Sequence, residues 1–227
     1  MMIGTVDGSQ RKAARVVGWA YLLAIPPAIF AEAAATAGNV VAHERLFRLG
    51  TASNLAAFAL DVVLITALYV VLKPVSRNLA LLAAFWGVIE TAILIVATVN
   101  DLEALRILSG AEYLQVFGPD RLQALARMSI SAHGAAYNVG LVLAGLRSTV
   151  FCYLWFRSSY IPKPLAAWGL FSSLLLAACA YAFIIVPELA KVLSVGIYGG
   201  PIFIFELTMG FWLLFKGLRQ PGLAEPP

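Results

Sequence analysis

Residues that carry charge or bind metals are scarce in this chain. Only 12% of the 227 residues are charged, whereas soluble domains carry about 25%, so the composition excludes an ordinary soluble domain. Two histidines are too few for a three-histidine zinc site. The two cysteines, Cys152 and Cys179, lie in apolar stretches and form no CxxC motif, which argues against a disulfide framework.

Signatures of the common enzyme classes are also missing. The chain has no GxSxG, P-loop, HExxH or dinucleotide-binding fingerprint. Haem held between helices needs axial ligands such as histidine, and His43 falls in a predicted loop away from His133. A carboxylate-rich metal site stays open on residue types alone, although no ExxH pair is present. We therefore expect no metal and no cofactor.

Apolar residues make up 61% of the chain and gather in six long runs. A helix needs about 20 mostly apolar residues to cross ~30 Å of hydrocarbon, and each run is long enough. We expect an all-α, polytopic transmembrane bundle of about six helices that forms a single domain over residues 1–227. The predicted spans are residues 14–36, 52–72, 79–100, 128–156, 165–186 and 198–216.

Prolines and glycines predict irregular backbone in two spans. Pro26 and Pro27 lie inside the first run and predict a kink there. The sequence Gly199-Gly200-Pro201 predicts an irregular start to the sixth span. The first run follows basic residues and so also looks like a signal peptide. Its length favours a retained span, and cleavage stays open.

Basic residues at the ends of the runs set the predicted orientation. With the N-terminus inside, nine lysines and arginines lie on the cytoplasmic side and six on the other. We expect both termini in the cytoplasm. The basic residues form no stripe, so we exclude nucleic acid as a partner. The cytoplasmic nine are Arg11, Lys12, Arg15, Lys73, Arg77, Arg157, Lys163, Lys216 and Arg219; the other six are Arg45, Arg48, Arg106, Arg121, Arg127 and Lys191.

The longest stretch outside the predicted spans, residues 101–127, mixes leucines and aromatics with charges. It is too polar to cross a bilayer. An amphipathic element that lies on the outer membrane surface, or that caps the bundle, is the prediction.

Ionisable residues inside the predicted spans are the candidate functional residues, because a buried charge is costly unless it is paired or hydrated. We take Glu90, Glu206 and Asp61 as candidate catalytic acids. Four acids face one arginine in the spans and cannot all ionise together at low dielectric, so we expect a proton-handling or cation-binding pocket. The candidate ligand-binding residues are Glu32, His133, Tyr137, Asn138 and Arg147.

One face of the fourth span is predicted to point into the bundle. At 100° per residue, His133, Tyr137, Gly140, Ala144 and Arg147 stay within about 40° of one line. The small residues of this line permit close approach of a neighbouring helix. A structural alternative stays open, in which the acids only pair with the arginine and lock the helices together.

Five segments resemble a bacterial membrane family, domain of unknown function 4386. The resemblance runs from about residue 13 to 217 and implies a multi-helix protein without an established activity. Members of that family often have arginine at the position of Gly87 and histidine at that of Arg147, so we hypothesise that the interior cation moved from the third span to the fourth. There it would pair with Glu90 or Asp61. The segments are "LFRLG" (46–50), "LYVVLKPVSRNLALLAAF" (69–85), "SGAEYLQVFGPDRLQALA" (109–126), "AHGAAYNVGLVLAGL" (132–146) and "FELTMGFWLLFKG" (205–217).

Three classes of function stay open at this point. The leading hypothesis is a multi-pass protein of the bacterial cytoplasmic membrane that binds a small molecule or a lipid, and a carboxyl acts as general acid in its enzyme version. The second is a small transporter coupled to protons or cations, although no internal repeat is visible. The third is a structural or partner-binding subunit. The lipid bilayer is the expected environment, and a homo-oligomer stays open.

Overall fold

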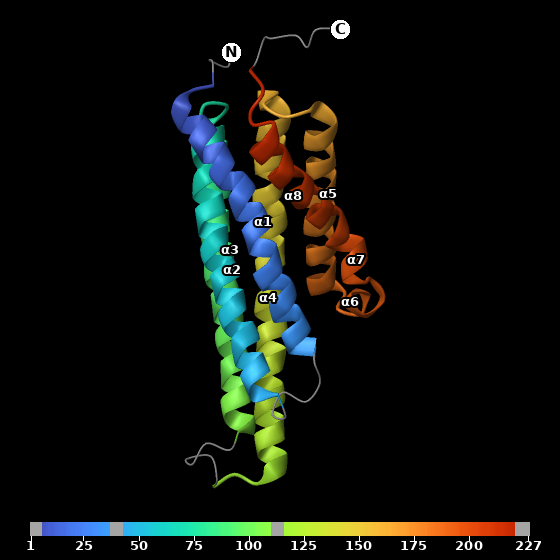
Figure 1. Cartoon of the computed structure of the whole chain (residues 1–227). Helices are drawn as coiled ribbons and strands as arrows, with labels where there is room; N and C mark the ends of the chain where they lie inside the picture. The colour runs from blue at the N-terminus through green and yellow to red at the C-terminus, as the bar shows by residue number, and fades with distance from the viewer. Residues whose placement is uncertain (1–5, 37–42, 110–115, 221–227) are drawn as a thin grey trace.

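The computed structural model describes residues 6–36, 43–109 and 116–220, and every element in these parts is a helix. Figure 1 shows a bundle of long, roughly parallel and antiparallel helices. The predicted all-α helix bundle is therefore confirmed. The helices are α1 Gly8–Thr36, α2 Glu44–Leu72, α3 Arg77–Leu108, α4 Pro119–Ser158, α5 Lys163–Ile185, α6 Leu189–Val192, α7 Val195–Tyr198 and α8 Gly200–Phe215.

The helices pack as a closed ring in the order α1, α2, α3, α4, α5 and α8. Consecutive helices of this ring are in contact, and α8 returns to pack on α1. The start of α1 and the end of α8 lie at the same end of the bundle, at the top of Figure 1. We call this the terminal end and the opposite one the distal end. This arrangement agrees with termini on the same side of a membrane.

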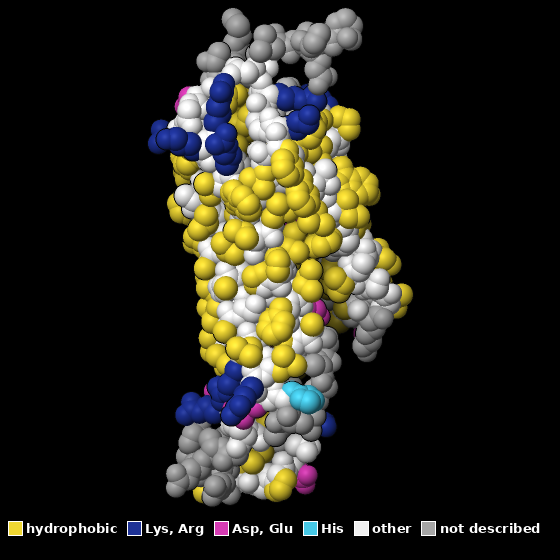
Figure 2. Space-filling view, viewed as in Figure 1, with side chains coloured by type: hydrophobic (Ala, Val, Ile, Leu, Met, Phe, Trp, Pro, Cys, Tyr) yellow, Lys and Arg dark blue, Asp and Glu magenta, His cyan; other side chains and the backbone are white. Residues whose placement is uncertain are grey.

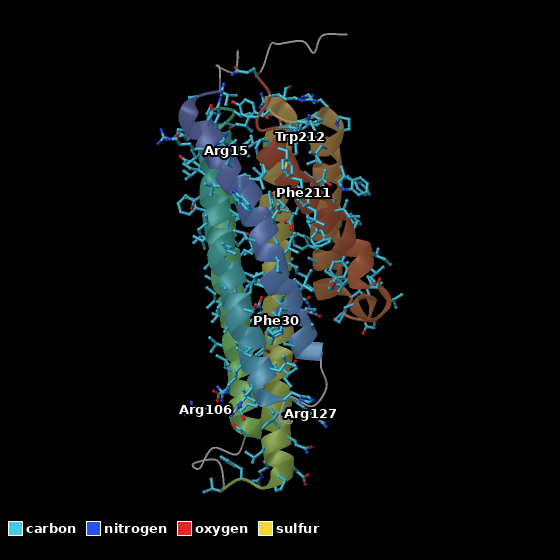
Figure 3. All side chains as sticks on the ribbon, viewed as in Figure 1. Arg15, Phe30, Arg106, Arg127, Phe211 and Trp212 are labelled. Atoms are coloured by element: carbon cyan, nitrogen blue, oxygen red, sulfur yellow. The ribbon has the colours of Figure 1, made fainter. Side chains whose placement is uncertain are left out.

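On the face of the bundle in Figure 2, an apolar band lies between two groups of basic side chains. Arg15 lies near the terminal end, whereas Arg106 and Arg127 lie near the distal end (Figure 3). The helices α1 to α5 are long and apolar enough to cross a membrane, and α8 is a shorter apolar helix. The chain is a multi-pass membrane protein with about six spans, as its sequence predicts.

The sixth span starts irregularly, as Gly199 and its neighbours predict. Two helices of four residues, α6 and α7, precede α8. With 16 residues, α8 is about 24 Å long, shorter than the hydrocarbon layer. In α1, Pro26 and Pro27 lie within one continuous helix, so the kink stays a prediction.

The predicted surface element at residues 101–127 is wrong. Most of this stretch belongs to α3 and α4, which project together beyond the other helices at the distal end. The apolar side chains that suggested a membrane-bound face instead pack the two helices on each other, with Ile107 and Ala126 buried between them. Residues 110–115 lie outside the described residues.

The terminal end is closed by a buried hydrogen-bonded contact. The Gln10 side chain donates hydrogen bonds to the Val71 carbonyl, at 3.0 Å, and to the Tyr160 hydroxyl, at 3.2 Å. Asp7 and Gln10 also cap the start of α1 reciprocally. These bonds tie α1, α2 and the α4–α5 connection together, so this end of the bundle is tightly packed.

Close contact between α4 and α5 depends on Gly145. A Cβ at this position would lie 2.6 Å from the backbone nitrogen and Cα of Ala177, and a backbone cannot rotate out of the way. We expect Gly145→Ala to lower the free energy of unfolding by about 1–2 kcal/mol. Thermal denaturation of the detergent-purified protein measures this effect.

Gly134, also on α4, provides the matched control because a Cβ there meets nothing within 4 Å. We expect Gly134→Ala to leave stability unchanged or to raise it, since alanine favours helix over glycine. Equal destabilisation by both substitutions would contradict the close contact between α4 and α5.

Candidate functional site

A buried cluster of three ionisable side chains joins α2, α3 and α4. Arg147 Nη1 donates to Asp61 Oδ1 at 3.0 Å, and Nη2 donates to Glu90 Oε1 at 3.2 Å. Its Nε lies 2.8 Å from Glu90 Oε2, so the guanidinium binds this carboxylate through two nitrogens. Arg147 is 7% exposed and Glu90 is 4% exposed. The predicted pairing of Arg147 with Asp61 and Glu90 is confirmed.

Gly87 and Thr91, one helical turn apart on α3, shape this cluster. A Cβ at Gly87 would lie 2.6 Å from Cδ of Arg147, so glycine leaves the room that the arginine side chain occupies. The Thr91 hydroxyl lies 3.2 Å from Asp61 Oδ2 and 2.9 Å from the Gly87 carbonyl, within donating distance of both. Gly87 thus lies beside Arg147, and the exchange of the interior cation between the two positions stays a prediction.

Glu206, on α8, faces a small cavity beside this cluster. The cavity volume is about 10 Å³, which is room for about one water molecule. Among the described residues, the Glu206 carboxyl forms no hydrogen bond and no ion pair. The wall of the cavity combines apolar side chains with the polar groups of Tyr21, Arg147 and Ser148. The lining residues are Tyr21, Leu64, Leu68, Arg147, Ser148, Phe151, Cys152, Ile202, Phe205 and Glu206.

A second group of polar side chains lies toward the distal end of α4. His133 Nδ1 lies 3.1 Å from the Ala97 carbonyl and 3.0 Å from Asp101 Oδ2. The Tyr137 ring stacks on the imidazole, with centroids 5.9 Å apart and planes inclined by 13°. Glu32 lies on α1 and has an exposed side chain.

The sequence-predicted residues therefore fall into two groups. Asp61, Glu90, Arg147 and Glu206 lie in the interior of the bundle. The other group surrounds His133, and 14 residues of α4 separate it from Arg147, which is about 21 Å along the helix axis. Each group has its own surroundings, so we treat the two groups as separate sites.

The predicted inward face of α4 makes the close contact that its small residues permit. A Cβ at Gly140 would lie 2.7 Å from Leu94 Cδ2 of α3, and Ala144 is buried. Asn138 is half-buried and forms no hydrogen bond with the described residues. Of the predicted ligand-binding residues it has the weakest structural support.

Several residues of these sites were missed by the sequence analysis. Asp101 directly follows the third predicted span, and only the fold shows that it contacts His133. Tyr21 and Ser148 line the cavity from helices whose mutual position the sequence leaves undetermined. In residues 6–36, 43–109 and 116–220, no group of three or more histidine, cysteine, aspartate or glutamate side chains converges as a metal site.

The chemistry of the interior site follows from its charges. One guanidinium faces two paired carboxylates, and a third carboxyl lies near it across a water-sized space. Such a site can hold a proton or a small cationic group, because the three acids outnumber the single base. Bulkier ligands would require the surrounding helices to separate.

Comparison with known proteins gives a family assignment. A curated protein of Archaeoglobus fulgidus, named "Uncharacterized protein", is 24% identical over 173 residues, which cover 74% of this chain and 83% of the relative. No solved structure matches. The family model described as "Domain of unknown function (DUF4386)" matches residues 14–217. Since this match includes all six predicted spans, the chain belongs to the domain of unknown function 4386 family.

Proposed function

We propose that this protein binds a small molecule or a lipid inside the membrane, and that Glu206 is the acid that exchanges a proton with it. We place it in the bacterial cytoplasmic membrane with both termini inside. The observation that carries the proposal is the Glu206 carboxyl, which faces a cavity without an ion-pair partner among the described residues. Asp61 and Glu90, in contrast, are held by Arg147.

Charge balance supports a neutral Glu206. Arg147 and its two partners together carry a net charge of −1 when all three are ionised. A third carboxylate beside them would add a second uncompensated negative charge in a medium of low dielectric, which is costly. Glu206 therefore keeps its proton and is the group that can donate it, as a general acid must. Asp61 and Glu90 position the arginine.

Access to the cavity favours binding or catalysis over transport. Toward the terminal end, Leu72, Trp155 and Tyr160 are fully buried in a packed core, and Gln10 bonds across it. A small cavity lined by apolar side chains and a carboxyl supports a binding protein or an intramembrane enzyme. A transporter needs alternating access to both faces, and a purely structural protein would pair every buried acid.

A carbodiimide tests the state and reactivity of Glu206. Apolar carbodiimides modify carboxylic acids that are protonated and reachable from an apolar phase. We expect dicyclohexylcarbodiimide to modify Glu206 in the detergent-purified protein and to leave Asp61 and Glu90 unmodified, because both of these carboxyls are bound by Arg147. Peptide mass mapping locates the adduct.

Glu206→Gln is the decisive variant in this experiment, because glutamine removes the acid and keeps the shape of the side chain. We expect Glu206→Gln to abolish the carbodiimide adduct inside the bundle. Glu188→Gln changes an exposed acid outside the bundle interior and is expected to leave that adduct unchanged. Modification of Glu90 in place of Glu206 would overturn the assignment of roles.

A further inference from the structure

The contact between α1 and α8 borders the cavity that Glu206 faces. Tyr21 of α1 and Glu206 of α8 both line this cavity. Gly210, one helical turn from Glu206 on the same face of α8, packs closely on α1, because a Cβ there would lie 2.9 Å from Leu22 Cγ. Glu206 therefore lies on the side of α8 that faces α1, one turn beyond a close contact of the two helices.

On the distal side of this contact, α1 has little cover. Ala28, Ile29 and Phe30 are all exposed, and three consecutive residues span more than half of the circumference of a helix. Phe30 lies on the part of α1 that extends beyond α8 toward the distal end (Figure 3). Glu206 itself is half-buried. The apolar phase of the membrane therefore comes close to Glu206 along the side between α1 and α8.

The size and the polar groups of the cavity define the polar end of a ligand. The volume of about 10 Å³ holds one oxygen atom with its hydrogens but no phosphate or carboxylate group. The hydroxyls of Tyr21 and Ser148 form no hydrogen bond with any described residue, and both side chains line the cavity with Arg147 and Glu206. The two carboxylates that Arg147 binds do not line it, so the charge that borders the cavity is the cation. An uncharged oxygen that accepts hydrogen bonds fits these surroundings.

We propose that an amphiphile whose polar end is a single uncharged oxygen enters from the bilayer between α1 and α8 and places this oxygen beside Glu206. The oxygen belongs to an alcohol or to a carbonyl compound, and the apolar chain lies along Ile29 and Phe30. The helices must separate to admit such a molecule, and Pro26 and Pro27 remove backbone hydrogen bonds from α1 beside the contact. This inference rests on the function proposed for Glu206 and adds the class of ligand and its route.

A disulfide between α1 and α8 tests the route. Leu22→Cys and Gly210→Cys are combined in a protein in which both native cysteines are serine. The two thiols meet, since a Cβ at Gly210 would lie 2.9 Å from Leu22 Cγ. Dicyclohexylcarbodiimide is larger than the cavity, so it reaches Glu206 only when helices separate. We expect the disulfide to slow modification of Glu206 at least tenfold, and we expect reduction to restore the rate.

Leu94→Cys with Gly140→Cys is the matched control for the disulfide. A Cβ at Gly140 would lie 3.1 Å from Leu94 Cγ, so this pair joins α3 to α4. We expect it to change the modification rate less than twofold. Equal rates in the oxidised and reduced α1–α8 pair, or no disulfide in that pair, would overturn the route. If Glu206 stays unmodified in the parent protein, the function proposed for Glu206 is refuted, and the ligand and its route fall with it.

Protection of Glu206 by defined compounds tests the class of ligand. The micelles of the purified protein receive 1-dodecanol, 2-dodecanone, n-dodecane or dodecyl phosphate at equal mole fraction. We expect the alcohol or the ketone to slow carbodiimide modification of Glu206 at least threefold, and we expect the hydrocarbon and the phosphate to leave the rate unchanged. Protection by the alcohol alone indicates a hydroxyl ligand, and protection by the ketone alone indicates a carbonyl ligand.

Tyr21→Phe combined with Ser148→Ala locates the bound oxygen. The double variant keeps Glu206 and removes the two free hydroxyls of the cavity, so we expect modification to continue and protection to be lost. Three results would overturn the class of ligand and leave the function proposed for Glu206 untouched. These are no protection by either oxygen compound, equal protection by n-dodecane, and protection that survives in the double variant.

Discussion

Arg147→Met is expected to lower the free energy of unfolding by about 3–5 kcal/mol. The substitution keeps most of the side-chain volume and removes the cation from between Asp61 and Glu90, 3.0 Å and 2.8 Å from its nitrogens. Two carboxyls then lie in a buried site without a counter-ion and must either stay charged at low dielectric or take up protons. Thermal and denaturant unfolding in detergent measures the loss.

Arg157→Met is the matched control, since Arg157 lies on the same helix but is exposed and packs over the Tyr153 ring in cation–π geometry. We expect it to change stability by less than about 0.5 kcal/mol. Adding Asp61→Asn and Glu90→Gln to Arg147→Met should recover part of the loss, because the uncompensated acids are then gone. A fully stable Arg147→Met protein would show that the ion pairs do not hold the bundle together.

Glu90→Gln and Glu206→Gln are expected to differ by about 2–3 kcal/mol in the free energy of unfolding. Glu90 accepts a hydrogen bond from Arg147 Nη2 and forms an ion pair with Arg147 Nε. Loss of its charge removes the ion pair and weakens a hydrogen bond to a charged group, which is worth about 1.5–3 kcal/mol. Glu206 has no such partner among the described residues, so its amide replacement should be neutral or slightly stabilising. Side-by-side thermal denaturation of the two purified variants measures the difference.

The comparison of Glu90→Gln with Glu206→Gln tests whether Glu206 has a structural role. If Glu206→Gln unfolds as readily as Glu90→Gln, then Glu206 also holds helices together, and its role in the proposed site is refuted. If both variants are as stable as the parent, then the ion pair of Arg147 with Asp61 alone stabilises the bundle at this site.

Much of the fold could be predicted because membranes impose simple rules. Each span must be long and apolar, so run lengths locate the helices, and the glycines near Gly199 mark the irregular start of α8. The helical period also predicts that Gly140 and Arg147 share a face of α4, and the structure places both on the packed side. These features depend on local sequence, which is why they can be read without a structure.

Contacts between helices could not be predicted in the same way. The sequence offers Arg147 several acids, and only packing selects Asp61 and Glu90 while it leaves Glu206 aside. The prediction for residues 101–127 was wrong for the same reason. Apolar residues at helical spacing can pack on a membrane surface or on a partner helix, and the sequence does not distinguish the two. The contact of Asp101 with His133 links two helix ends that the chain places 32 residues apart.

Infrared spectroscopy of the purified protein tests the central claim most directly, because protonated carboxyls absorb apart from carboxylates. Near neutral pH the account predicts a protonated carboxyl band that disappears in Glu206→Gln and persists in Glu90→Gln and Asp61→Asn. A band that survives in Glu206→Gln, or that is lost only with Glu90, would contradict the account, since the interior proton would then belong to the acids that Arg147 binds.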